Sequence, residues 1–313
     1  MRNLICISLI TFLTTFIVFI MLANSVPIDK KGLTYIQAGQ SAKTIYADLY
    51  KHNVIKDTLA FSLYRKFTGS TLKTGEFSYD ISDSPSDLLH KIDTNDYYYR
   101  SITIPEGLSV MQVTYLLHDN SYLSGDLIIN PADMLMPETY NFVRGDKRLA
   151  LYNNMKQSFQ KMAVPIWKNR DERLPFKTFL QAVTLASIVE KETGLDGERK
   201  KVASVFINRL RKGIPLQSDS TTIYALSEGL GKLDRRLTRK DWKFKHPFNT
   251  YYIQGMPPHP IAGVGLKSLK AVLNPIKSGY YYFVATGLGG HYFSKTLAEH
   301  NKNYQQYKKN LNK

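Results

Sequence analysis

The feature that most constrains this chain is an uninterrupted apolar segment near its amino terminus. Residues Leu4–Ala23 read LICISLITFLTTFIVFIMLA, which is 20 residues without a charge. A helix of that length is what is needed to cross the hydrocarbon core of a bilayer. A cleaved signal peptide is the alternative, since Leu22–Ser25 offers small residues, but its apolar core is usually shorter. The segment therefore predicts an uncleaved anchor, with residues 1–25 as cytoplasmic tip and transmembrane helix.

The charges around this segment bear on its orientation. Only Arg2 precedes it, and Lys30 and Lys31 follow it, so the charge bias across the membrane is small. A short amino terminus inside and a long body outside is the simpler arrangement. No other segment has comparable length and apolarity, which predicts a single-pass protein of the inner (plasma) membrane with its body on the outer (periplasmic) side.

Composition narrows the partners. The 313 residues carry a formal net charge of +16, which favours anionic partners such as nucleic acid, anionic lipids or carboxylate-bearing cell-wall polymers. Nucleic acid is disfavoured because the chain lacks a nucleic-acid-binding motif and the anchor would place the body outside. The single cysteine, Cys6, lies in the apolar segment, so an intramolecular disulfide and a cysteine-based metal site are excluded. No metal and no cofactor is implied.

A weak repeat follows the anchor. Tyr35–Ser41 (YIQAGQS) and Thr103–Ser109 (TIPEGLS) lie 68 residues apart, and each reads as a short strand, a glycine turn, a serine N-cap and an amphipathic helix. The repeat predicts a small α+β module over residues 30–145. Its strand–GxS–helix pattern resembles LysM-type modules, which grip N-acetylglucosamine chains, although a common βα turn would give the same pattern.

The remaining residues, 146–313, have the pattern of a mixed α+β domain. Helical periodicity covers Leu151–Met162, Phe176–Glu192 and Glu198–Arg211, and Tyr280–Ala285 (YYYFVA) reads as a buried strand. The expected fold is therefore α+β throughout: one amino-terminal transmembrane helix, a small LysM-like module, and a mixed α+β catalytic domain.

Two glutamates close the second of these helices. Glu192 continues the apolar series Leu185, Ile188 and Val189 at helical spacing, whereas Glu190 points to another side, toward solvent or the rim of a cleft. Burial on an apolar face raises the pKa of a glutamate, and such a group can protonate a glycosidic oxygen near neutral pH.

A structural role is the alternative for Glu192. The next helix carries arginines at 199 and 209, and an ion pair with either would explain a carboxylate on this face. Periodicity alone leaves the two roles equally open.

Several long runs carry a family resemblance. They are LASIVEKETG, ERKKVASVFINRLRKGIPLQSDSTTIYAL, FNTYYIQGMPPHPI, YYYFVATGLGGHYFS and EHN. In order and content they resemble the endolytic murein transglycosylases, the MltG or YceG-like family, over nearly the whole chain. The chain departs from the family pattern at Ser220 and Val264, where the family commonly has proline, and at Phe248, where it has tyrosine.

The resemblance implies an enzyme that cuts the MurNAc–GlcNAc bond of nascent peptidoglycan and leaves a 1,6-anhydro-MurNAc end. Its catalytic glutamate lies in the motif matched by IVEKET, so Glu192 is expected to be the general acid and base, with Glu190 as second choice. Glu192 is preferred because Glu192–Thr193 is similar to the Glu–Ser pair of lysozyme-like lytic transglycosylases.

Further residues and partners follow from the same reading. The residues expected to orient the sugars are Gln217, Asp219, Asn249, Tyr251 and His291. The family suggests cell-wall synthases as protein partners. Two alternatives stay open: a hydrolytic muramidase in which Asp219 activates water, and a membrane-tethered peptidoglycan-binding module without enzymatic activity.

Overall fold

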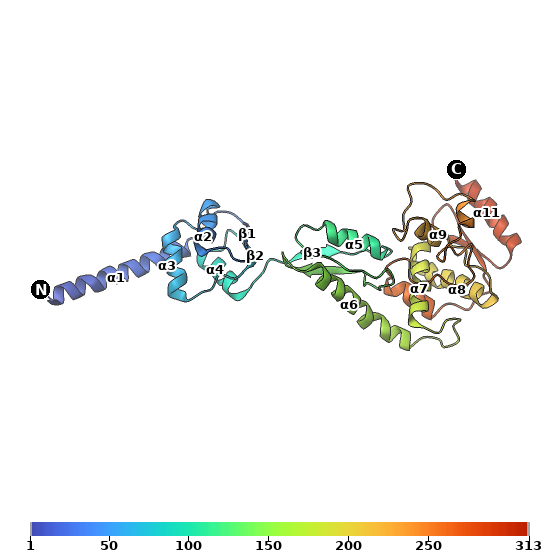
Figure 1. Cartoon of the computed structure of the whole chain (residues 1–313), viewed down its shortest axis with the longest axis horizontal. Helices are drawn as coiled ribbons and strands as arrows, with labels where there is room; N and C mark the ends of the chain where they lie inside the picture. The colour runs from blue at the N-terminus through green and yellow to red at the C-terminus, as the bar shows by residue number, and fades with distance from the viewer. Residues whose placement is uncertain (1, 312–313) are drawn as a thin grey trace. The chain divides into compact units, whose positions relative to one another are not determined.

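The computed structural model describes the backbone of residues 2–311, and the side chains from Cys6 onward. The chain forms two compact units (Figure 1). The amino-terminal unit contains the residues up to Ser101 and the short segment Asn141–Asp146. The carboxyl-terminal unit contains Ile102–Tyr140 and the chain from Lys147 onward.

The amino-terminal unit begins with one long helix and continues as a small α+β fold. Its elements are α1 (Arg2–Ser25), β1 (Gly32–Ile36), α2 (Ala42–Lys51), α3 (Thr58–Thr68), β2 (Gly75–Tyr79) and α4 (Pro85–Thr94). Strands β1 and β2 pair antiparallel, with Thr34 opposite Phe77. Phe61, Phe77 and Leu88 are fully buried in the core between this two-stranded sheet and the helices.

Helix α1 is, within the described residues, the one helix long and apolar enough to span a membrane. That property resides in Cys6–Ser25, which is almost entirely exposed in the isolated chain. A signal sequence would pass the same test of length and composition. The end of α1 packs on its own unit, since Ile20 and Asn24 are buried and the Asn24 side chain donates to the carbonyl oxygen of Ala60 at 3.4 Å.

The repeat predicted from the sequence has the expected local geometry. Gly39 and Gly107 adopt φ values of +79° and +81°, a region open to glycine, and Ser41 and Ser109 then cap α2 and α5 (Val110–Asp119). The two copies, however, lie in different units.

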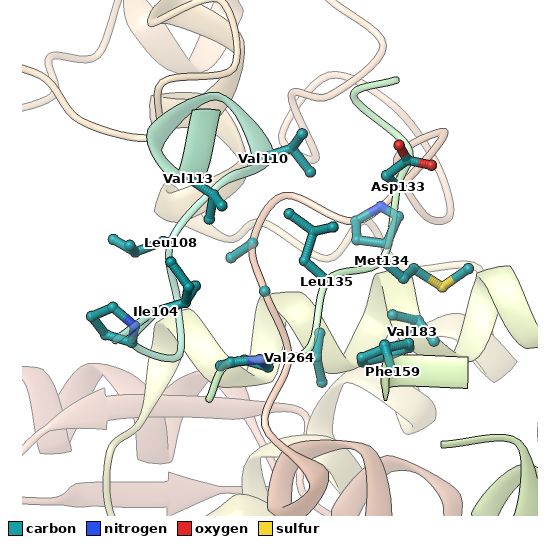
Figure 2. Close-up of a pocket in the computed structure, with 15 residues that line it drawn as sticks. Ile104, Leu108, Val110, Val113, Asp133, Met134, Leu135, Phe159, Val183 and Val264 are labelled. Carbon is teal, nitrogen blue, oxygen red and sulfur yellow. The ribbon is translucent and has the colours of Figure 1, made fainter. Parts of the chain in front are cut away.

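The two compact units therefore divide the chain elsewhere than at the domain boundary expected after residue 145. Residues 102–140 belong to the carboxyl-terminal unit because their apolar side chains pack on its helices. Figure 2 shows Ile104, Val113 and Leu135 around one narrow apolar pocket, with Phe159 and Val264 closing it from elsewhere in the unit. A sequence repeat reports local geometry, whereas a domain boundary depends on where the apolar faces are buried.

The carboxyl-terminal unit is mainly helical. Besides α5 it contains α6 (Arg148–Lys168), α7 (Phe179–Glu192), α8 (Asp196–Lys212), α9 (Asp219–Leu226), η1 (Asp241–Lys243), α10 (Leu266–Leu273), β5 (Tyr282–Ala285), β6 (His291–Ser294) and α11 (Leu297–Leu311). Strands β3 (Arg100–Thr103) and β4 (Thr139–Phe142) form a two-stranded sheet, and each strand has residues in both units. Strands β5 and β6 form an antiparallel hairpin, with Tyr282 opposite Ser294.

Candidate active site

Helix α7 is the central helix of the carboxyl-terminal unit, and it carries Glu192 at its last position. Thr178 caps its start in a reciprocal capping box with Gln181, so the helix begins at 179 rather than at the expected 176. Every residue from Ala182 to Val189 is buried. A helix buried on all sides holds its terminal side chain in a fixed place, which is what an acid of defined geometry needs.

Two cavities meet at Glu192. The first, called here the Arg209 cavity, has a volume of about 870 Å³ with its open mouth included, and Glu192, Arg209, Leu216, Gln217, Asp219, Tyr251, Tyr282, Phe283, Leu297 and His300 line it. The second, called the Lys191 cavity, has a volume of about 720 Å³, and Gly107, Gln112, Lys191, Glu192, Asp219, Ser220, Ile223, Tyr224, Gly231 and Ile261 line it. Glu192 and Asp219 are common to both, so Glu192 has open space on two sides.

Two hydroxyls contact the Glu192 carboxylate. Ser218 donates to Oε1 at 2.5 Å and Ser220 reaches the same oxygen at 3.3 Å, while the two hydroxyls lie 2.7 Å apart. Burial raises the pKa of Glu192 above its usual range, the nearby Asp219 charge raises it further, and the serine hydrogen bonds lower it in part. No described cation forms an ion pair with this carboxylate. Glu192 is therefore a carboxyl group biased toward its protonated form.

Glu190 does not lie where the helical pattern placed it. Its side chain is only 5% exposed, and Oε1 accepts a hydrogen bond from Arg199 Nη1 at 3.0 Å. Oε2 accepts the backbone N–H of Gly265, also at 3.0 Å. The expectation that Glu190 faces solvent or a cleft rim is wrong, because α10 and the segment before it cover that side of α7. The expected alternative of an ion pair with Arg199 thus holds for Glu190 and not for Glu192.

Three predicted site residues line the Arg209 cavity together with Glu192: Gln217, Asp219 and Tyr251. Asp219 Oδ1 accepts hydrogen bonds from the Tyr251 hydroxyl at 2.8 Å and from Trp242 Nε1 at 3.0 Å. The Tyr251 and Trp242 rings stack with centroids 5.2 Å apart. Burial and the Asp219 charge raise the pKa of Tyr251, so its hydroxyl stays protonated and donates to the carboxylate.

Asn249 is a predicted sugar ligand whose position contradicts that role. It is 0% exposed, its Oδ1 accepts from Thr222 at 2.8 Å, and its Nδ2 donates to the carbonyl oxygens of Trp242 and Phe244 at 3.1 and 2.8 Å. A buried amide with these partners has no capacity left for a sugar. Asn249 instead holds the loop that carries Trp242.

His291 also lies outside the residues that line either cavity. Its Nδ1 is 2.7 Å from Glu198 Oε2, and its backbone N–H donates to Glu198 Oε1 at 2.9 Å. When it is protonated, His291 lowers the pKa of the Glu192 carboxyl. The structure therefore places His291 beside the site as a neighbour and not in the cavity wall.

Three polar residues that were not predicted from the sequence line the Arg209 cavity: Arg209, Tyr282 and His300. The signal for His300 was present, since it lies in the EHN run, but helical periodicity gives no reason to bring that run to Glu192. Within residues 2–311, no three His, Cys, Asp or Glu side chains gather into a group that could hold a metal ion.

Comparison with known proteins gives a consistent family. The profile of the YceG-like family matches residues 34–306. A Bacillus subtilis protein named endolytic murein transglycosylase is 30% identical, over 90% of this chain and 87% of its own length. A Streptococcus pneumoniae protein of the same name is 25% identical over 95% of this chain, which spans 65% of that longer relative.

A solved structure agrees with these relatives. The crystal structure of a yceG-like protein from Listeria monocytogenes has a TM-score of 0.53 and 29% identity, and the match covers 87% of this chain and 98% of that one. The family profile covers far more than half of the chain, and it includes α7 and both cavities. This chain belongs to the YceG-like family.

Proposed function

We propose that this protein is an endolytic lytic transglycosylase, which cuts the MurNAc–GlcNAc bond within peptidoglycan strands with Glu192 as its single acid and base. The observation that carries the proposal is the place of Glu192, a carboxyl with a raised pKa at the junction of two open cavities. The relatives named endolytic murein transglycosylase support the substrate and the reaction class.

The chemistry needs one proton donor that can later act as an acceptor. In the first half, protonated Glu192 donates its proton to the bridging O4 while the bond between that oxygen and C1 of MurNAc breaks. In the second half, the C6 hydroxyl of the same MurNAc attacks C1, and its proton returns to Glu192. The products are a strand with a new 4-hydroxyl and a 1,6-anhydro-MurNAc end, and no water is consumed.

One carboxylate suffices because the nucleophile belongs to the substrate. Glycosidases that use water or a covalent intermediate need a second carboxylate, whereas an internal hydroxyl in the right orientation is effective by proximity. Ser218 holds Oε1 of Glu192 and so fixes the orientation of the acid. The open space on both sides of Glu192 fits a strand that continues beyond the cut in both directions, as endolytic cleavage requires.

Glu192 is preferred to Glu190 for a geometric reason. Both oxygens of Glu190 are occupied by Arg199 and by the N–H of Gly265, and Glu190 lines neither cavity. A carboxylate whose two oxygens are held in this way, outside both cavities, is not placed to reach a glycosidic oxygen. Glu190 is therefore assigned a structural role.

The setting of the enzyme is part of the proposal. Helix α1 would anchor the protein in the inner (plasma) membrane with the body on the outer side, where peptidoglycan is made. The LysM-like part would be the amino-terminal unit, whose β1–α2 segment has the strand, turn and capped helix that suggested sugar binding. Cell-wall synthases would be its protein partners.

A hydrolytic muramidase is a second candidate because Asp219 lines both cavities together with Glu192. Two carboxylates on one cavity are the arrangement that lets one of them activate water. In this structure, Oδ1 of Asp219 already accepts hydrogen bonds from Tyr251 and Trp242, so that oxygen is less available to hold a water molecule. The transglycosylase is therefore favoured.

Cleavage in H₂¹⁸O separates the two reactions. Purified glycan strands are incubated with the protein, and the new ends are analysed by mass spectrometry. A transglycosylase gives 1,6-anhydro ends without ¹⁸O, whereas a muramidase gives reducing ends with one ¹⁸O each. Strands of unchanged length would reject both and leave a binding module.

A further inference from the structure

Arg209 is a buried cation that no carboxylate neutralises. It lies on α8, it is 8% exposed, and it lines the cavity that contains Glu192. No acidic side chain of the described chain lies within ion-pair distance of its guanidinium. A buried charge without an opposite charge is costly, and a ligand that carries the opposite charge would offset that cost.

The hydrogen bonds of Arg209 leave one side of the guanidinium free. Nε and Nη1 donate to the carbonyl oxygens of Tyr281, Pro215 and Leu216 and to the side-chain oxygen of Gln217, at 2.7, 3.1, 3.0 and 3.1 Å. Nη2 has no partner among the described residues, and it is not sealed from the cavity. The centroid of the Tyr282 ring lies 5.3 Å from the guanidinium carbon and helps to hold Arg209 in place. Nη2 is therefore the nitrogen of Arg209 that remains available as a hydrogen-bond donor.

His300 is a second polar side chain in the wall of the same cavity. Its Nδ1 is the one side-chain nitrogen or oxygen of the described chain that is fully buried without a hydrogen-bond partner. Burial and the Arg209 charge lower the pKa of His300, so the ring is neutral near pH 7. A neutral imidazole can donate one hydrogen bond and accept another, which complements the guanidinium.

The other charges on this wall do not satisfy Arg209. Asp219 makes no ion pair with it, and its Oδ1 is engaged by Tyr251 and Trp242. Glu192 is hydrogen-bonded by Ser218 and forms no ion pair. Arg209 and His300 therefore form a polar end of the cavity, which offers one positive charge and hydrogen-bond donors to an anion.

From this geometry we infer that the Arg209 cavity binds a carboxylate carried on the muramyl residue beside the scissile bond. The inference rests on the proposed function, because that substrate brings carboxylates to this cavity. A planar guanidinium and a carboxylate form short charge-assisted hydrogen bonds, and a phosphate-free glycan offers no other anion. Arg209 thus becomes a specificity-determining residue for the substituent of the sugar.

Two sources can supply the carboxylate. In a peptide-free strand it is the free lactyl group of MurNAc. In a peptide-bearing strand the lactyl group is an uncharged amide, and the carboxylates are those of the stem peptide. The same site thus makes cleavage depend on whether, and how, the muramyl residue carries a peptide.

Wild-type full-length protein in detergent micelles tests this with four substrates. They are peptide-free strands and peptide-bearing strands, each with free carboxylates and with the carboxylates methyl-esterified. For the kind of strand whose carboxylate Arg209 binds, peptide-free or peptide-bearing, esterification should lower kcat/KM about 10- to 100-fold. This is the range expected for one hydrogen bond to a charged group. For the other kind of strand, esterification should change kcat/KM little.

Two variants connect the effect to the residue. Arg209→Gln should lower cleavage of the free-acid strands to the level of the esters and cause no further loss on the esters. Arg211→Gln, which removes the same charge from the same helix but outside both cavities, should leave the ratio between acid and ester unchanged. Thermal melting checks that Arg209→Gln is folded, since its Nε and Nη1 hydrogen bonds are also lost.

If the wild-type protein has the same kcat/KM on free and on esterified strands, for peptide-free and peptide-bearing strands alike, the inference is overturned. This comparison needs no variant. An equal loss by Arg209→Gln on acid and ester would overturn it too, because that result indicates a structural role. Failure of the wild-type protein to cut any strand would instead reject the proposed function, so the two failures are distinguishable.

Discussion

The ion pair between Glu190 and Arg199 allows the two neighbouring glutamates of α7 to be separated by experiment. Both side chains of the pair are nearly inaccessible, at 5% and 7% exposure. Glu190→Gln keeps the shape of the side chain and removes its charge, so the Arg199 charge stays buried without its closest counter-charge. Glu192→Gln is the matched control: it makes the same change two residues away, where no ion pair is lost.

The expected magnitude follows from what Arg199 retains. Breaking a buried pair costs about 3–5 kcal/mol of the free energy of unfolding. Arg199 keeps its contact with Asp196 at 3.1 Å, although that carboxylate is 58% exposed, and it still donates to Ser268. The loss should therefore be near the lower end, about 3 kcal/mol, or roughly 6–12 °C in Tm for a unit of this size. Glu192→Gln should leave Tm unchanged or raise it slightly, because it removes a charge that burial disfavours.

Thermal melting by circular dichroism and strand cleavage well below Tm give the two readouts. Glu190→Gln should melt earlier and, while folded, still cut strands. Glu192→Gln should melt like the wild-type protein and cut none. The reasoning would be refuted if Glu190→Gln melted like wild type and lost cleavage, since Glu190 would then be functional and not structural.

Three further predictions concern pH and packing. Because folding raises the pKa of Glu192, the folded protein holds this proton more tightly than the unfolded chain does. The free energy of unfolding therefore falls as pH rises from the ordinary carboxyl pKa through the raised one. Over this pH range, Tm should fall less in Glu192→Gln than in the wild-type protein. Ser218→Ala removes a hydrogen bond that lowers the pKa of Glu192, so that pKa should rise. The alkaline limb of the pH profile of kcat/KM should then move to higher pH. An unchanged or acid-shifted limb would contradict the assignment of Glu192 as the acid. Asn249→Ala leaves the buried carbonyl oxygens of Trp242 and Phe244 unpaired, which should cost about 1–3 kcal/mol of unfolding free energy in a denaturant titration, whereas a loss of substrate affinity at full stability would restore Asn249 as a sugar ligand.

The sequence predicted those parts of the site that depend on local order. Helical spacing placed Glu192 on the apolar face of α7, and the structure confirms that α7 ends at Glu192 with all residues from Ala182 to Val189 buried. The strand, glycine turn and serine cap of both repeat copies are confirmed in the same way. Helical periodicity and helix capping depend on residues that are close together in the chain, so they can be predicted from a single sequence.

What the sequence did not predict depends on partners far along the chain. Glu190 was expected to face solvent because helical periodicity considers only the residues of the helix itself. Gly265, which is 75 residues away in the chain, covers that side of the helix. Asn249 was expected to bind sugar because its type suits it, but backbone carbonyls of the preceding loop occupy its amide. Arg209 and His300 line the same cavity because β5 packs on α8 and α11 packs on β5.

The rate of strand cleavage by Glu192→Gln tests the central claim most directly. Wild-type protein and the variant are compared on the same purified glycan strands, at the same concentration, with thermal melting to show that both are folded. Loss of a general acid and base predicts a fall in cleavage of at least about 100-fold, with 1,6-anhydro ends from the wild type only. Substantial cleavage by folded Glu192→Gln would contradict the account.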